Sequence, residues 1–144
     1  MVNRLRLASA ILWTVIIFIL CWTPDIYLPV QEEPGLLAWI LPLPLDKLVH
    51  AGIFAVFGVL WLRAARGEKR WYLWILVGGI AAAALTELGQ EIPIVHRDAG
   101  LDDVIADIIG VILAFPAFFL LERFLGRLAV QSGREVGHEV KATG

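Results

Sequence analysis

Four apolar segments, each close to the length of a membrane span, constrain the fold of this chain more than any other feature. They lie at about 5–22, 48–65, 71–88 and 104–121. A helix rises 1.5 Å per residue, so roughly 17–25 apolar residues cross a hydrocarbon core about 30 Å thick. Soluble helices show a polar stripe every third or fourth residue, whereas the middle of ILWTVIIFILCW shows none. The hydrophobic fraction, 59%, also exceeds the roughly 45–50% of soluble proteins. The sequence therefore predicts an all-α, integral membrane four-helix bundle.

We expect one four-helix domain over residues 1–125, with helices at about 5–22, 46–65, 71–90 and 103–122. The remaining residues, 126–144, are polar, mixed in charge and rich in Gly, which predicts a disordered cytoplasmic tail. Arg4 and Arg6 are placed like the basic start of a signal peptide. The sequence around Trp22, however, lacks the small residues of a cleavage site, so the first helix is expected to be retained.

The distribution of basic residues predicts which ends of the helices face the cytoplasm. Of the 12 Lys and Arg residues, ten lie near the N-terminus, in the 63–70 hairpin or beyond residue 122. Lys47 and Arg97 are the two exceptions. Short basic loops remain in the cytoplasm. Both termini are therefore expected inside, with the 23–46 and 89–103 segments facing outward.

Ionisable residues recur at one depth in three of the expected helices. His50, Glu87 and Asp107 each lie four residues, about one helical turn, inside another acidic residue at the outer end of the same helix. A charge in lipid costs at least about 2.5–3.5 kcal/mol, so these side chains should face inward and meet one another. We expect an outward-opening polar pocket between the second, third and fourth helices, built from Asp46, Lys47, His50, Glu87, Gln90, Arg97, Asp103 and Asp107.

Two interpretations of this pocket involve no metal. In the first, the protein is a non-catalytic structural membrane protein whose polar cluster locks the bundle, with Asp102 and Asp103 as helix N-caps. In the second, the pocket captures a ligand: Lys47 and Arg97 hold a phosphate or carboxylate at the positive ends of two helices. The excess of acids opposes an anion unless the ligand also brings a cation or hydroxyl groups. If chemistry occurs, His50 and Glu87 are the candidate catalytic residues for proton transfer.

A third interpretation is a metal-dependent intramembrane hydrolase or transferase. His50, Glu87 and Asp107 offer one nitrogen and two carboxylates, a donor set that suits zinc, manganese or similar ions. A metal-bound water would then attack an ester or phosphoester. A divalent metal is therefore the one cofactor that the residues suggest.

Three pieces of sequence in order also resemble a known family. DKLVHAGIFAVFG carries Asp-Lys-x-x-His-x-x-x-Phe, and TELGQEIPIVHRDAGLDDVIADIIG carries Glu-x-x-Gln followed by Arg, Asp and Gly. On these motifs, residues 45–115 resemble the VanZ-like family of small bacterial membrane proteins. The matching positions are Asp46, Lys47, His50, Phe54, Glu87, Gln90, Arg97, Asp103 and Gly110. Asp107 departs from the pattern, because the family usually has Asn there.

The VanZ-like family takes its name from a protein linked to low-level resistance to teicoplanin, a glycopeptide that binds cell-wall precursors outside the membrane. The resemblance implies a location in the bacterial cytoplasmic membrane and binding or modification of a lipid-linked or other cell-envelope component. It also implies a relation to glycopeptide resistance. We expect membrane lipids and an envelope lipid or cell-wall precursor as partners, and no nucleic acid. The sequence indicates no oligomeric state.

Overall fold

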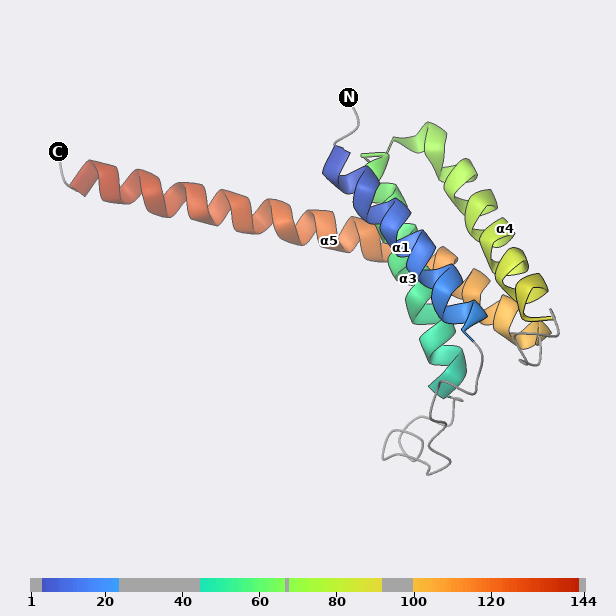
Figure 1. Cartoon of the computed structure of the whole chain (residues 1–144). Helices are drawn as coiled ribbons and strands as arrows, with labels where there is room; N and C mark the ends of the chain where they lie inside the picture. Colours follow the sequence, from blue (N-terminus) through green and yellow to red (C-terminus); the bar gives the residue numbers. More distant parts are fainter. Residues whose placement is uncertain (1–3, 24–44, 67, 92–99, 143–144) are drawn as a thin grey trace.

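The described part of the chain folds into four long helices. The computed structural model describes residues 4–23, 45–66, 68–91 and 100–142. The α-helices are α1 (Arg4–Trp22), α3 (Leu45–Ala64), α4 (Tyr72–Gln90) and α5 (Leu101–Ala142), and the short 3₁₀-helix η2 (Lys69–Trp71) precedes α4. All four α-helices are long and apolar enough to cross a membrane. The predicted all-helical architecture with four candidate spans is therefore confirmed (Figure 1).

The helix α1 is attached to its neighbours by two tryptophans. Trp13 Nε1 donates a hydrogen bond of 3.0 Å to the carbonyl oxygen of Ile53 in α3. Trp22 Nε1 donates one of 3.1 Å to the carbonyl oxygen of Thr86 in α4. The indole of Trp22 lies so close to Gly89 that a Cβ at position 89 would overlap it. The end of α1 therefore lies against the end of α4, and these two helices run in the same direction.

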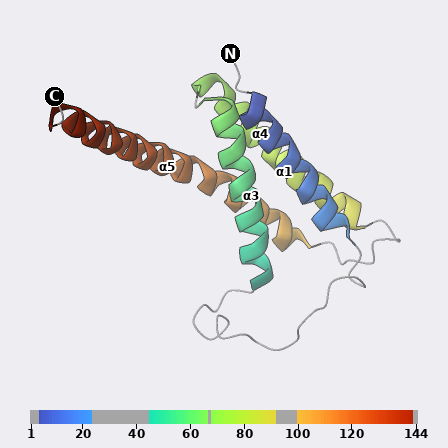
Figure 2. The ribbon, with the colours of Figure 1, turned by 60° about the vertical axis from the view of Figure 1, so that its left-hand side comes forward.

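The helices α3 and α5 also run together, in the opposite direction to α1. Near their starts, Lys47 contacts Asp103. Further along, Arg63 Nε lies 3.6 Å from Glu122 Oε1. The fold consequently has an acidic end, where α3 and α5 begin, marked by Asp46, Lys47, His50, Asp103 and Asp107. It also has an arginine end, where α1 begins and α3 ends, marked by Arg6, Arg63 and Arg66 (Figure 2).

Small residues allow α3 and α5 to approach closely. A Cβ at Gly110 would overlap the carbonyl oxygen of Ala51, and a Cβ at Gly58 would overlap the Cβ of Ala114. Membrane helices commonly associate through such small residues, because lipid provides no hydrophobic drive for them to join. Ala51 follows His50 in the sequence, and Gly110 lies three residues beyond Asp107. The close contact between Ala51 and Gly110 therefore sets the distance between the side chains of His50 and Asp107.

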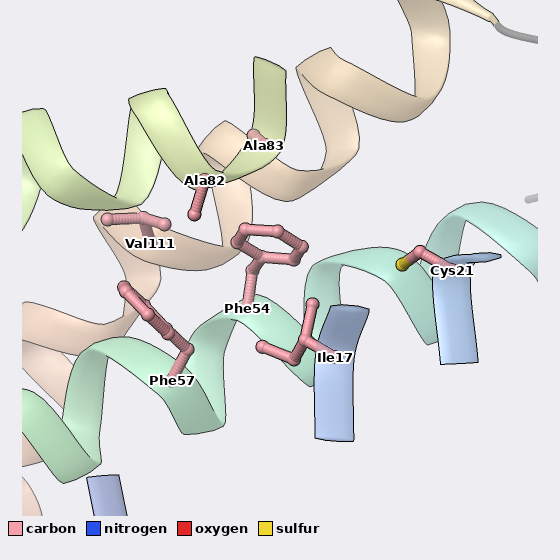
Figure 3. Packing of buried hydrophobic residues seen from close by; sticks show 7 residues of the cluster. All are labelled: Ile17, Cys21, Phe54, Phe57, Ala82, Ala83 and Val111. Carbon is pink, nitrogen blue, oxygen red and sulfur yellow. The ribbon is translucent and has the colours of Figure 1, made fainter. Parts of the chain in front are cut away.

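The core is apolar in the middle of the helices and polar at the acidic end. Its central cluster contains Ile17, Cys21, Phe54, Phe57, Ala82, Ala83 and Val111 (Figure 3). Large apolar side chains lie on the outside as well, with Leu73 at 65% and Leu120 at 68% exposure. His50, Glu87 and Asp107, by contrast, are buried. Apolar side chains outside with charged ones inside are what a hydrocarbon surrounding requires.

The helix α5 is longer than predicted. It does not end near residue 122 but continues to Ala142, so the structure has helix where the sequence led us to expect a polar tail. Pro116 lies inside α5 and does not end it. No proline follows, and a single glycine in a helix costs only about 1 kcal/mol, so a helix that is already formed can propagate through Gly126.

Candidate functional site

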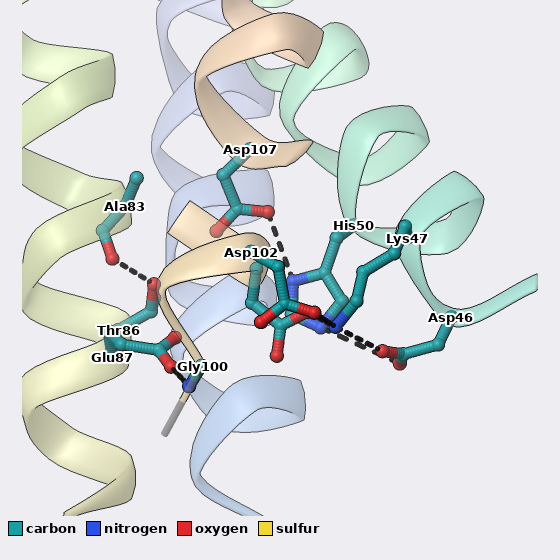
Figure 4. A network of polar contacts seen from close by, with 10 residues as sticks. Asp46, Lys47, His50, Ala83, Thr86, Glu87, Gly100, Asp102 and Asp107 are labelled. Carbon is teal, nitrogen blue, oxygen red and sulfur yellow. Dashed lines mark hydrogen bonds and ion pairs between the residues drawn. The ribbon is translucent and has the colours of Figure 1, made fainter. Parts of the chain in front are cut away.

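The candidate site lies at the acidic end, where the first two turns of α3 and α5 meet the last turn of α4 (Figure 4). Five of its eight predicted members are buried: His50, Glu87, Gln90, Asp103 and Asp107. His50, Glu87 and Asp107 stand about one to two turns from the ends of their helices, in the layer that the four-residue spacing predicts, whereas Asp103 lies in the first turn of α5 and Gln90 ends α4. Thr86 is also buried there, and its hydroxyl donates a 2.8 Å hydrogen bond to the carbonyl oxygen of Ala83.

Lys47 is surrounded by carboxylates. Its Nζ lies 3.0 Å from Asp46 Oδ2 and 2.8 Å from Asp102 Oδ2, and it also contacts Asp103 Oδ1. Asp46 and Asp102 are mostly exposed, whereas the side chain of Asp103 is only 12% exposed. An ammonium group has three N–H donors, and three carboxylates occupy them here. The cation that we expected to orient an anionic ligand therefore serves to hold the acids of α3 and α5 together.

His50 and Asp107 form a buried pair across the α3–α5 contact. His50 Nδ1 lies 3.0 Å from Asp107 Oδ1, and the two residues are 8% and 1% exposed. A carboxylate accepts hydrogen bonds, so Asp107 favours the tautomer with the proton on Nδ1. The other ring nitrogen, Nε2, then has its lone pair available on the side of the exposed Asp46, whose Oδ1 lies 3.8 Å away. Asp107 thus orients a histidine whose second ring nitrogen faces Asp46, a mostly exposed side chain.

Glu87 has a different partner from the one we expected. Its Oε1 accepts a hydrogen bond from the backbone N–H of Gly100, the residue just before α5. Within the described residues, no hydrogen bond or ion pair joins Glu87 to His50. Glu87 therefore connects the end of α4 to the start of α5. Direct proton transfer between His50 and Glu87, the two predicted catalytic residues, is not supported by a contact between them.

Two polar atoms at this end lack partners among the described residues. They are Asp107 Oδ2 and Gln90 Nε2, and both are buried. A buried polar atom without a hydrogen bond costs about 1–3 kcal/mol, so most such atoms in native proteins have a partner of some kind. One is an acceptor and the other a donor, which suits a ligand carrying hydroxyl groups.

Among the described residues, the side chains that are close enough together to bind a metal ion differ from the predicted set. Asp46, His50 and Asp103 each offer a donor atom, and these atoms all lie within 4.8 Å of one another. The predicted set of His50, Glu87 and Asp107 does not form such a group, because Glu87 is drawn to the backbone of Gly100. One imidazole and two carboxylates form a plausible donor set for a divalent ion, but Lys47 competes for both carboxylates.

The structure thus gathers Asp46, Lys47, His50, Asp103 and Asp107 directly, and attaches Glu87 through Gly100. Arg97 lies outside the described residues, as does most of the two segments expected to face outward, so those predictions stay predictions. Asp102 was expected only as a helix cap, yet it contacts Lys47. In the sequence, the only indication of the contact between Lys47 and Asp102 was the pair of adjacent acids, Asp102 and Asp103, at the start of α5.

Replacing Lys47 with methionine is expected to destabilise the fold, because Asp103 would remain beside two other acids without their shared cation. Breaking a buried ion pair costs about 3–5 kcal/mol and an exposed one about 0–1 kcal/mol, so this partly exposed site should lose roughly 2 kcal/mol. Thermal unfolding in detergent measures the loss. The control Asp102→Asn removes an exposed acid and should leave the unfolding temperature nearly unchanged. Equal losses in both variants would contradict a central role for the Lys47–Asp103 contact.

Comparison of the chain with protein-family models, curated proteins and solved structures finds no match.

Proposed function

We propose that this chain is a multi-pass protein of the bacterial cytoplasmic membrane that binds or modifies a component of the cell envelope at its acidic end. His50 is the group that accepts and returns a proton if chemistry occurs. The observation that carries the proposal is the buried Asp107–His50 pair, with Nδ1 and Oδ1 3.0 Å apart. Buried carboxylate–histidine pairs orient a histidine for acid–base work or for metal binding. A purely structural lock does not require the second nitrogen, Nε2, to lie near the mostly exposed carboxylate of Asp46.

The charges of the site favour a ligand with hydroxyl or amine groups. Among the described residues at this end, the carboxylates of Asp46, Asp102, Asp103, Asp107 and Glu87 outnumber the one ammonium group, that of Lys47. Lys47 is already occupied, so a phosphate or carboxylate would meet mainly like charge. Sugar hydroxyls and amino groups of a lipid-linked envelope precursor would instead find acceptors, and the Gln90 amide would supply a donor.

The distribution of Lys and Arg residues is the reason for placing the acidic end on the outer side of the membrane. Ten of the 12 Lys and Arg residues belong to the termini or to the hairpin between α3 and α4, which favours the cytoplasm for those parts. The acidic end then opens to the outside, where cell-wall precursors are exposed. The resemblance of residues 45–115 to the VanZ-like family supports the same assignment and a relation to teicoplanin resistance.

A divalent cation is the second candidate ligand, and the grouping of Asp46, His50 and Asp103 favours it. A bound ion would supply an activated water for attack on an ester or phosphoester. Asp107 would then act as the partner that orients the histidine ligand, as carboxylates commonly do behind metal-bound imidazoles.

Native mass spectrometry of the protein purified in its own lipids tests these proposals. The wild-type protein should retain an envelope lipid or precursor, and His50→Ala should reduce its occupancy at least about tenfold. The matched control is Glu91→Gln, which changes an exposed acid one turn beyond Glu87. A metal mass that disappears with His50 and with a chelator would favour the second candidate. If no variant retains a ligand and His50→Ala only lowers the thermal stability, the cluster is a structural lock and the proposal is wrong.

A further inference from the structure

A second charged cavity lies at the arginine end, away from every residue of the proposed site. It has a volume of about 280 Å³ and is lined by Arg6, Arg63, Arg66, Phe118 and Glu122. Three elements contribute these residues: the start of α1, the end of α3 with the turn that follows, and α5. Figure 2 shows the start of α1 beside the end of α3. The cavity therefore forms only where three separate parts of the chain meet.

The cavity carries more positive than negative charge. Three guanidinium groups line it, and Glu122 is the one carboxylate among its lining residues. Glu122 Oε1 lies 3.6 Å from Arg63 Nε, which is too long for a hydrogen bond. That Nε is buried and has no hydrogen-bond partner among the described residues. Because buried N–H groups are nearly always paired, this atom indicates an acceptor that the described chain does not supply.

Arg66, which lines the cavity, has an unusual backbone conformation. Arg66 has a φ of 56°, in the left-handed region that favours glycine, and it lies two residues beyond the end of α3. Its backbone N–H donates a 3.2 Å hydrogen bond to the carbonyl oxygen of Arg63, and Arg6 Nη1 donates one of 3.5 Å to the same oxygen. Glycine is the usual residue at such a helix end. An arginine there strains the backbone while it places a guanidinium group at the rim of the cavity.

We propose that this cavity binds the phosphate group of a phosphate-bearing ligand, either the headgroup of an anionic phospholipid or a soluble phosphomonoester. Guanidinium groups form paired hydrogen bonds to phosphate oxygens, and a phosphate has enough oxygens to contact several arginines at once. The negative end of the α3 dipole opposes an anion, but Arg6 and the Arg66 N–H cover the carbonyl of Arg63. The cavity lies at the start of the first candidate span and the end of the second, and Phe118 and Glu122 of the fourth span complete it. Basic pockets near the ends of membrane helices are known to bind lipid headgroups.

Titration calorimetry in a neutral detergent tests the proposal with three ligands. These are dihexanoyl phosphatidylglycerol, dihexanoylglycerol without phosphate, and glycerol 3-phosphate. The wild-type protein should bind at least one phosphate ligand and should not bind dihexanoylglycerol. Tighter binding of the phosphatidylglycerol than of glycerol 3-phosphate identifies a lipid headgroup site, whereas equal or weaker binding identifies a site for soluble phosphate compounds.

The decisive variant is Arg66→Gly, because it should raise stability and lower binding. Glycine relieves the backbone at φ 56°, so the melting temperature should rise by a few degrees. Loss of one guanidinium should weaken phosphate binding about tenfold. Glu122→Gln, which removes the one carboxylate of the lining, should strengthen binding about threefold or more.

The matched control is Arg70→Gln. Arg70 is exposed at the same end, pairs with Glu68 at 2.7 Å and lies over the Trp71 ring, outside the cavity. Its loss should change the Kd by less than about twofold, in line with the small contribution of exposed pairs. No binding of either phosphate ligand, or equal losses in Arg66→Gly and Arg70→Gln, would overturn the proposal. None of these residues belongs to the acidic end, so the result is independent of the proposed function.

Discussion

A valine in place of Gly110 is expected to separate α3 from α5 and to abolish the candidate site with the same change. A Cβ at position 110 would overlap the backbone carbonyl oxygen of Ala51, which cannot turn aside as a side chain can. Overpacking a close contact costs typically about 1–3 kcal/mol and occasionally more, and a clash with backbone belongs at the upper end. We expect a loss of about 3 kcal/mol in the free energy of unfolding in detergent. Ligand retention at the acidic end should disappear as well.

The control for this variant is Gly52→Ala, which also replaces a glycine inside one of the two helices. No atom lies within 4 Å of a Cβ built at Gly52. Alanine is a better helix former than glycine by about 1 kcal/mol, so this variant should be neutral or slightly more stable. If Gly110→Val were as stable as Gly52→Ala, the close approach of the two helices would not be what holds the site together.

Leucine in place of Asp107 should have the second-largest effect, and asparagine at the same position should be tolerated. Leucine removes the acceptor for His50 Nδ1, which lies 3.0 Å away in a buried setting. An unpaired buried donor costs about 1–3 kcal/mol. Asparagine keeps an acceptor oxygen and replaces Oδ2, which has no described partner, with an amide donor.

Nitrogen NMR of labelled histidine and thermal unfolding together check this pair of variants. Wild-type protein and Asp107→Asn should both keep the proton of His50 on Nδ1, and their stabilities should agree within about 1 kcal/mol, since both retain the hydrogen bond. Asp107→Leu should lose the fixed tautomer, the stability and the bound ligand together. An asparagine variant that unfolds as readily as the leucine variant would show that the charge of Asp107, and not its hydrogen bond, holds the site.

The layer of the site was predictable from sequence because it depends only on helix geometry. A four-residue spacing places His50, Glu87 and Asp107 one turn inside their helices, and the cost of charge in lipid turns them inward. The structure has all three buried at one end. The length and apolarity of the helices follow from the same local rules, which is why four candidate spans were found.

The pairing inside that layer was not predictable, because it depends on how the helices rotate and how closely they approach. The close approach of Gly110 to Ala51 brings Asp107 within hydrogen-bond distance of His50. Glu87 instead accepts a hydrogen bond from the backbone N–H of Gly100. Lys47 had several acids within reach, and only the register of α3 against α5 selects Asp102 and Asp103 as its partners beside Asp46. The end of α5 was also missed, since composition alone does not stop a helix once it has formed.

The shared direction of α3 and α5 has a consequence for synthesis in a chain whose helices are long and apolar enough to cross a membrane. Lys47 and His50 find their α5 partners 56 and 57 residues further along the chain. When α3 leaves the ribosome, Lys47 has Asp46 within reach, but Asp102 and Asp103 have not yet been made. In a chain whose candidate spans enter a bilayer, Lys47 and His50 would stay near water or inside the insertion machinery until α5 arrives. The three later helices would then enter the bilayer as one group.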